Sequence, residues 1–210
     1  MSPHQYGDQS VKKLMWAVNI SLVPALLVSF YFFGLGAVIV TLTSVVSAVA
    51  FEYLITKYML KREPTITDGS AIITGLLLAF NVPSNLPIWI ILIGSFVAIG
   101  IGKMSFGGLG NNPFNPALVA RVFLLISFPV HMTSWPEPEV LSMAYTDAQT
   151  GATYLGVVKE GLKNGVAYSE LVQDKFSYLK TFTGQEGGSI GEVSALALII
   201  GGIFLLIRKV

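Results

Sequence analysis

The sequence predicts an all-α polytopic membrane protein, and its composition and the clustering of its apolar residues support this fold class. Hydrophobic residues make up 53% of the chain and charged residues only 12%, with a mean hydropathy of +0.68. A soluble domain carries about 25% charged residues. Runs such as Ile20–Phe33, Leu35–Phe51 and Ile88–Ile101 hold almost no charge. A membrane-spanning helix needs roughly 20 mostly apolar residues, so several spans are expected.

The residue types present exclude several kinds of chemistry. Without cysteines, the chain has no thiolate catalysis, cysteine-bound cluster or disulfide. His4 and His131 lie far apart in the sequence, so we expect no metal site, and no residue is predicted to be catalytic. The net charge of +1 gives no sign of nucleic-acid binding. The N-terminus lacks a signal-cleavage pattern, so we expect the first apolar run to be retained.

Turn residues divide the apolar sequence into six predicted membrane helices. Gly34–Gly36 and Asn81–Pro87 are rich in Gly, Asn and Pro and predict tight turns. The predicted helices are Met15–Phe33, Leu35–Tyr53, Ile66–Asn81, Leu86–Lys103, Pro116–Val130 and Ile190–Ile207.

Basic residues predict the orientation of these helices, because cytoplasmic loops are enriched in Lys and Arg. With a cytoplasmic N-terminus, every basic residue that flanks a predicted helix end falls on the cytoplasmic side, whereas the two tight turns carry no charge. The flanking basic residues are Lys12, Lys13, Lys57, Lys61, Arg62, Lys103, Arg208 and Lys209.

The longest connection divides the chain into three predicted parts. Residues 1–130 would hold five helices, residues 131–189 an external loop, and residues 190–210 the sixth helix. The loop contains four lysines against seven acidic residues, which suits the outer face. A loop of this length is usually functional.

The third and fifth predicted helices are short and begin in polar, Gly- or Pro-containing sequence. Such helices indicate broken segments around a binding site. Asn115 is expected to cap the fifth helix with Pro116 at its first position, and Thr67 or Asp68 is expected to cap the third. Both starts lie on the predicted cytoplasmic side.

Other polar residues have structural interpretations. Glu52 is expected to pair with or reach toward Lys57. Ser189 and Glu192 fit a capping box before the sixth helix. Two interpretations of Arg121 stay open: a functional charge that faces the bundle interior, or a side chain that only extends to the cytoplasmic interface. The stretch SFGGLGNNPFNP, residues 105–116, is either an ordinary turn or a ligand cradle. It has no phosphate-loop ending.

The stretch DAQTGATYL, residues 147–155, places small hydroxyl residues in the external loop without a neighbouring base. From these residues alone, an Asx or Ser/Thr turn is the expected structure. However, the pattern resembles the acceptor motif at which flavin transferases attach FMN by a phosphoester. The resemblance implies attachment to Thr153, within a motif formed by Asp147, Thr150, Gly151 and Ala152.

Three longer stretches resemble the RnfD/NqrB family of membrane subunits: TDGSAIITGLLLAFNVP, GGLGNNPFNPALVARVFLLISFP and GGSIGEVSALALIIGG. The N-terminal sequence is closest to the RnfD branch. The family has about ten membrane helices, so the resemblance implies that this chain holds the N-terminal part of the fold and ends within it.

The resemblance implies a subunit of an Rnf-type complex in the prokaryotic cell membrane. Electrons would pass through covalent FMN on the outer face, and ferredoxin:NAD⁺ electron transfer would be coupled to Na⁺ or H⁺ translocation. The expected partners are other membrane and membrane-anchored subunits, including one that carries a second flavin, the flavin transferase, and the lipid bilayer.

The resemblance also implies a non-covalent riboflavin within the helix bundle. We place it at the cytoplasmic side, where glycines allow close approach and amides match the pyrimidine edge of the ring. The expected residues are Gly107, Gly108, Gly110, Asn111, Asn112 and Asn115. Two other functions stay open: a solute transporter or channel with broken helices and no flavin, and a flavin-free scaffold subunit.

Overall fold

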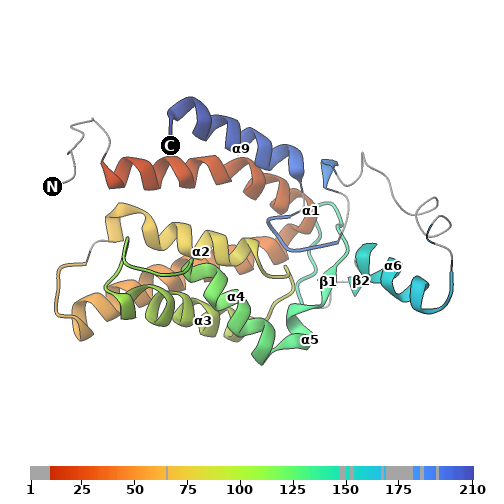
Figure 1. Ribbon diagram of the computed structural model, residues 1–210, viewed down its shortest axis with the longest axis horizontal. Coiled ribbons are helices and arrows are strands. Elements are labelled where there is room, and N and C mark those ends of the chain that lie inside the picture. The colour runs from red at the N-terminus through yellow and green to blue at the C-terminus, as the bar shows by residue number, and fades with distance from the viewer. Residues whose placement is uncertain are drawn as a thin grey trace.

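The computed structural model describes residues 10–64, 66–146, 150–151, 154–166, 168, 182–184, 187–192 and 194–210. These residues are mainly helical (Figure 1). The α-helices are α1 (Val11–Leu54), α2 (Ser70–Phe80), α3 (Ile88–Phe96), α4 (Pro116–Ser127), α5 (Pro129–Met132), α6 (Tyr154–Lys163) and α9 (Ala195–Arg208). Short 3₁₀-helices are η2 (Ile66–Asp68) and η4 (Met104–Phe106), and π-helices are η1 (Ile55–Met59) and η3 (Val97–Lys103). Strands β1 (Trp135–Pro136) and β2 (Thr150–Gly151) form one antiparallel pair.

Helix α1 folds back on itself at Gly34, where the backbone leaves helical geometry at φ 53° and ψ −132°. Figure 1 shows the first half in red and the second half, in orange, running back in the opposite direction. The predicted turn at Gly34–Gly36 is therefore confirmed. The first half, Val11–Phe33, is roughly 35 Å long at the usual helical rise, which is enough to cross a bilayer core.

Small residues let the helices approach closely. Gly75 of α2 lies against the Val45 backbone of α1, and the Ser44 hydroxyl donates to the Gly75 carbonyl at 2.7 Å. Helix α9 packs along the first half of α1 (Figure 1), where Gly201 meets the Ser21 carbonyl. The main apolar core includes Phe33, Val40, Leu78, Phe80, Leu86, Ile90, Ile91, Ala98, Ala120 and Leu124.

Two helices within the described residues are long and apolar enough to cross a membrane: Val11–Met59 and Ile88–Phe106. Helices α2, α4 and α9 are apolar but shorter. The composition and these helices support a membrane protein, and the count of six crossings stays a prediction.

Helix α9 begins later than the sequence predicted. The start expected at Ile190 is a turn, and the helix begins at Ala195. The predicted capping box is wrong, because Ser194 is the N-cap and its hydroxyl accepts from the Ala197 N–H at 3.3 Å. The Ser189 carbonyl instead closes a turn by accepting from the Glu192 N–H at 3.1 Å. Ser194 can take this role because its backbone is extended where the helix begins.

The segment 139–142 completes the broken end of α1. The Glu139 and Leu141 N–H groups donate to the carbonyls of Phe32 and Tyr31, both at 2.9 Å. In the other direction, the Leu35 N–H donates to the Ser142 carbonyl at 2.8 Å. These bonds satisfy backbone groups that the turn at Gly34 removes from the helical ladder.

The turn 81–87 lies at this same end of the bundle. The Tyr145 hydroxyl donates to the Leu86 carbonyl at 2.5 Å, and the Ile190 N–H donates to the Val82 carbonyl at 3.2 Å. We call this the Gly34 end, formed by residues 34–36, 81–87 and 131–146. Both predicted tight turns therefore meet the described part of the predicted external loop. That region also contains helix α6, which the sequence analysis did not predict.

Replacing Gly34 with alanine should strongly destabilise the fold. A Cβ atom there would overlap the Ser142 backbone, and the positive φ adds strain. The strain alone costs about 2 kcal/mol, so the thermal unfolding midpoint in detergent, followed by circular dichroism, should fall. Gly202→Ala is the matched control, because a Cβ at Gly202 meets no atom within 4 Å. Equal midpoints for the two variants would contradict this account of the turn.

Candidate functional site

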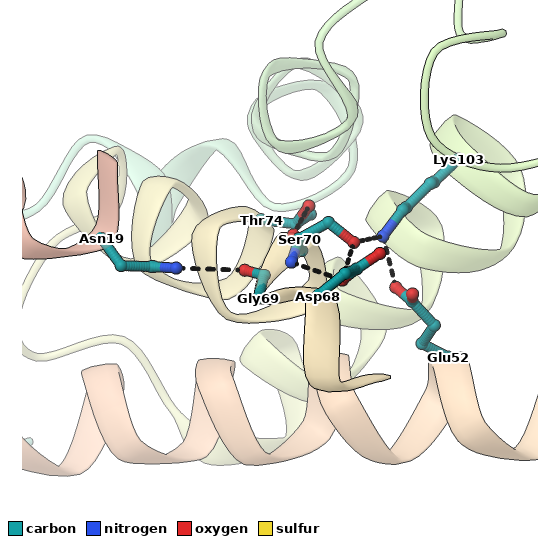
Figure 2. Close-up of polar contacts among 7 residues, drawn as sticks. All are labelled: Asn19, Glu52, Asp68, Gly69, Ser70, Thr74 and Lys103. Carbon is teal, nitrogen blue, oxygen red and sulfur yellow. Dashed lines mark hydrogen bonds and ion pairs between the residues drawn. The ribbon is translucent and has the colours of Figure 1, made fainter. Parts of the chain in front are cut away.

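A buried ion pair joins α1 to η3 at the end of the bundle opposite the Gly34 end. The Lys103 ammonium lies 2.5 Å from the Glu52 carboxylate, and the two side chains are only 2% and 1% exposed. The ammonium also donates to the Ser70 hydroxyl at 2.7 Å. Figure 2 shows the Lys103 side chain reaching between Glu52 and Ser70. A buried charge is tolerated only when it is paired and hydrogen-bonded, and both conditions are met here.

The same cluster fixes the start of α2. One carboxylate oxygen of Asp68 accepts from the Ser70 N–H at 2.8 Å and from the Ser70 hydroxyl at 2.7 Å. Asp68 thus accepts from the first N–H of α2, but the N-cap position is Gly69, one residue after the predicted Asp68. Gly69 has a φ of 82°, and its carbonyl accepts from the Asn19 amide at 3.2 Å (Figure 2). The first half of α1 is thereby connected to the cluster.

The predicted pairing of Glu52 with Lys57 is wrong. Lys57 belongs to η1, is exposed, and donates to the Tyr53 hydroxyl at 2.6 Å. Lys103, which the orientation argument placed at the cytoplasmic ends of the helices, is buried. A signal for this pair was present in the sequence: Glu52 and Lys103 are opposite charges, each directly after a long apolar run, on the same predicted side.

The glycine-rich segment after Lys103 lines a cavity whose wall includes the ion pair. Gly107, Gly108 and Gly110 all have φ values between 88° and 102°, the left-handed region that favours glycine. The cavity has a volume of about 300 Å³. Its lining includes Glu52, Asp68, Lys103, Gly107 and Gly108. Two residues of the predicted second flavin site thus share a cavity with the buried ion pair.

The remaining residues of that predicted site lie outside the lining of this cavity. Asn115 caps α4, with its side-chain oxygen accepting from the Ala117 N–H at 3.0 Å, as predicted. Asn111 is exposed, and the side-chain oxygen of Asn112 is buried without a hydrogen-bond partner. A Cβ atom at Gly108 or Gly110 would meet nothing within 4 Å. Glycine is therefore required at these two positions by backbone conformation rather than by packing within the chain.

Arg121 points toward the Gly34 end. Its guanidinium donates to the Asn81 side-chain oxygen at 3.2 Å, and Asn81 follows the last residue of α2. The interpretation that Arg121 reaches toward the cytoplasmic interface, on the side where α4 begins, is therefore wrong. The side chain is half-buried and supports the C-terminal end of α2, where a positive charge is favourable.

The structure describes two residues of the predicted flavin-attachment motif. Thr150 and Gly151 form β2 and pair with Pro136 and Trp135 of β1. Thr150 is exposed. A Cβ atom at Gly151 would overlap the Glu137 carboxylate, so glycine fits this close contact. Asp147, Ala152 and Thr153 lie outside the described residues.

Breaking one side of the ion pair should cost more than removing both charges. Glu52→Gln or Lys103→Met leaves a buried charge without its partner, which costs about 3–5 kcal/mol of unfolding free energy. The double variant should recover a large part of this loss. The measurement is unfolding in mixed micelles with increasing SDS, analysed as a double-mutant cycle.

Lys57→Met is the matched control, since Lys57 is exposed and its replacement should change the stability by about 0.5 kcal/mol or less. Strictly additive losses from the two single variants would contradict a coupled buried pair.

Comparisons with known proteins agree with the family motifs found in the sequence. The profile of the NQR2, RnfD, RnfE family matches residues 1–210. The chain is 46% identical over 211 residues to the D subunit of the Na(+)-translocating ferredoxin:NAD(+) oxidoreductase complex of Acetobacterium woodii, covering 100% of this chain and 62% of the relative. It is 43% identical over 214 residues to the D subunit of the proton-translocating ferredoxin:NAD(+) oxidoreductase complex of Clostridium ljungdahlii, covering 99% and 61%.

A third relative is the D subunit of the ion-translocating oxidoreductase complex of Stutzerimonas stutzeri, which is 37% identical over 218 residues, covering 96% of this chain and 62% of the relative. The chain thus spans 61–62% of the length of these curated relatives. Because the family profile covers every residue and the motifs agree with it, the chain belongs to the NQR2, RnfD, RnfE family.

Proposed function

We propose that this chain is the D subunit of an Rnf-type electron-transport complex. It would relay electrons through covalent FMN and help to couple ferredoxin:NAD⁺ electron transfer to ion translocation. The observation that carries the proposal is similarity along the whole chain to relatives named as the D subunits of such complexes. Those two relatives are named for H⁺ and Na⁺ respectively. Identity to them therefore supports translocation of Na⁺ or H⁺ without selecting between them.

The attachment point proposed for FMN is Thr153. The motif residues Thr150 and Gly151 lie on a short strand at the Gly34 end, and Thr150 is exposed. Exposure suits recognition by a separate flavin transferase. When bound, the flavin would supply the electron-transfer chemistry, and the chain would supply position and electrostatics.

A second, non-covalent flavin is proposed at the opposite end. The cavity beside Gly107 and Gly108 has a polar and charged wall that includes Lys103. The buried side-chain oxygen of Asn112, which lacks a partner, supports a ligand with a hydrogen-bond donor near this segment. Both α2 and α4 begin close to Lys103, because Lys103 contacts Ser70 and the neighbouring Gly102 packs against Pro116. Their positive dipole ends would favour an electron-rich ring.

The proposed complex lies in the prokaryotic cell membrane, with the Gly34 end facing outward. Lys57, Lys61 and Arg62 are exposed and close to the opposite end in sequence and fold, which supports a cytoplasmic position for that end. The partners would be the other membrane and membrane-anchored subunits, one of which carries a second flavin that faces this loop. A solute transporter without flavin would not account for the attachment motif.

Thr153→Val should abolish flavin that stays on the chain after denaturation. Valine keeps the shape of threonine but lacks the hydroxyl that forms the phosphoester. The measurement is in-gel flavin fluorescence after denaturing electrophoresis, with protein from a host that contains the transferase. Thr150→Val should lower the signal only in part, because Thr150 belongs to the recognition sequence.

Thr181→Val is the matched control and should keep full fluorescence, since Thr181 lies in the same region outside the motif. Undiminished fluorescence in Thr153→Val would exclude Thr153 as the attachment point. Denaturation should also release free riboflavin from the wild-type chain, and its absence would count against the second flavin.

Cysteine labelling tests the orientation, and the absence of native cysteines removes background. Met143→Cys suits the Gly34 end, because Met143 is 83% exposed whereas Ser142 is packed against Gly34. It should react with a membrane-impermeant thiol reagent added to intact cells. Arg62→Cys should react only after the membrane is permeabilised. The reverse pattern would place the flavin loop in the cytoplasm.

A further inference from the structure

We propose that a small cavity at the Gly34 end receives the ring of the flavin attached to the loop. This inference rests on the proposed function and adds a binding site for the isoalloxazine. The cavity has a volume of about 260 Å³. Its lining residues are Asn85, Pro87, Val130, His131, Ser134 and Thr146. No single stretch of sequence marked this site, because its walls come from three separate segments.

Hydrogen bonds hold the walls of the cavity together. The Asn85 amide donates to the Ser134 hydroxyl at 3.3 Å, which ties the turn 81–87 to the segment after α5. The Tyr145 hydroxyl donates to the Leu86 carbonyl, which brings Thr146 to the same turn. Burial raises the pKa of the Tyr145 phenol, so it stays a neutral donor at physiological pH. His131 makes an edge-to-face contact with Trp89, with ring centroids 6.3 Å apart.

The cavity lies close to β2, which holds Thr150 and Gly151 of the attachment motif. Ser134 directly precedes Trp135, and Trp135 pairs with Gly151. On the other side, Thr146 directly precedes the first motif residue, Asp147. Thr153 follows Gly151 by two positions, a stretch that spans at most about 7 Å of chain. The ribityl phosphate arm adds its own length, so a ring attached at Thr153 is able to reach this site.

The lining suits a flavin ring chemically. One edge of the isoalloxazine alternates hydrogen-bond donors and acceptors, and the other end is apolar. The cavity offers amide, hydroxyl and imidazole groups from Asn85, Ser134, Thr146 and His131, which include both donors and acceptors. Val130 and Pro87 provide apolar surface. The Ser134 oxygen accepts from Asn85, which leaves its own proton for an acceptor in the cavity.

The cavity at the Lys103 end is out of reach of the flavin attached at Thr153. It is lined by Glu52, Asp68 and Lys103 and lies at the opposite end of the helices from β2, whose residues Thr150 and Gly151 belong to the attachment motif. The covalent arm therefore favours the cavity at the Gly34 end.

Collisional quenching of flavin fluorescence by iodide tests the site in the intact, flavinylated chain. The wild-type flavin should be protected relative to the flavin peptide released by proteolysis. Val130→Trp places a large side chain at the wall of the cavity and leaves the sequence of the motif unchanged, and Val130 is 78% exposed, so the fold should tolerate the change. This variant should keep its covalent flavin, and its quenching constant should rise to that of the released peptide.

Val140→Trp is the matched control, because Val140 is exposed but does not line the cavity; its quenching should stay at the wild-type level. His131→Leu should also lower the midpoint potential of the flavin, because it removes a group able to donate to the electron-rich reduced ring. An unchanged potential would remove His131 from the contact.

Wild-type quenching equal to that of the peptide, or no change in Val130→Trp, would overturn the site while leaving attachment at Thr153 intact. A wild-type chain without covalent flavin would instead overturn the proposed function, and this site with it.

Discussion

The positive charge of Lys103 within an apolar bundle is the constraint on which the arrangement of the helices depends. An ammonium group removed from water must find a carboxylate and further acceptors. Glu52 supplies the carboxylate from the second half of α1, and Ser70 supplies a hydroxyl from the start of α2. Asp68 orients that hydroxyl. Meeting this requirement fixes the relative positions of α1, α2 and η3 at one end of the bundle.

At the Gly34 end, backbone hydrogen bonds hold the helix ends in place. The chain reverses direction at Gly34 and again at residues 81–87, and each reversal exposes peptide groups that an apolar environment cannot satisfy. Segment 139–145 and the turn after residue 187 supply the missing partners, through bonds such as Leu35 to Ser142 and Gly191 to Phe80. The region predicted as an external loop is thus partly integral to the helix ends. This anchoring supports β1, which pairs with Thr150 and Gly151 of the proposed flavin-attachment motif.

Sequence patterns located helices and turns well because apolar runs and Gly, Asn or Pro clusters report local preference. They located Gly34 and the Asn115 cap for this reason. They failed where contacts between residues far apart in the sequence determine which side chains pair. Glu52 pairs with a residue 51 positions away, and Arg121 selects Asn81 at a distance of 40 positions. Ser194, rather than Ser189, caps α9, because a two-residue motif cannot specify which backbone becomes extended.

The bonds between segment 139–142 and residues 31–35 run almost entirely through the main chain. The side chains of this segment take no part in these bonds, so the bonds constrain the N–H groups of Glu139 and Leu141 more strongly than the residue types. Proline, which lacks an N–H, would be selected against at those two positions and tolerated beside them. The sequence already shows this contrast, with proline at positions 136 and 138. Divergent relatives should accordingly retain the path of this segment long after its side chains become unrecognisable.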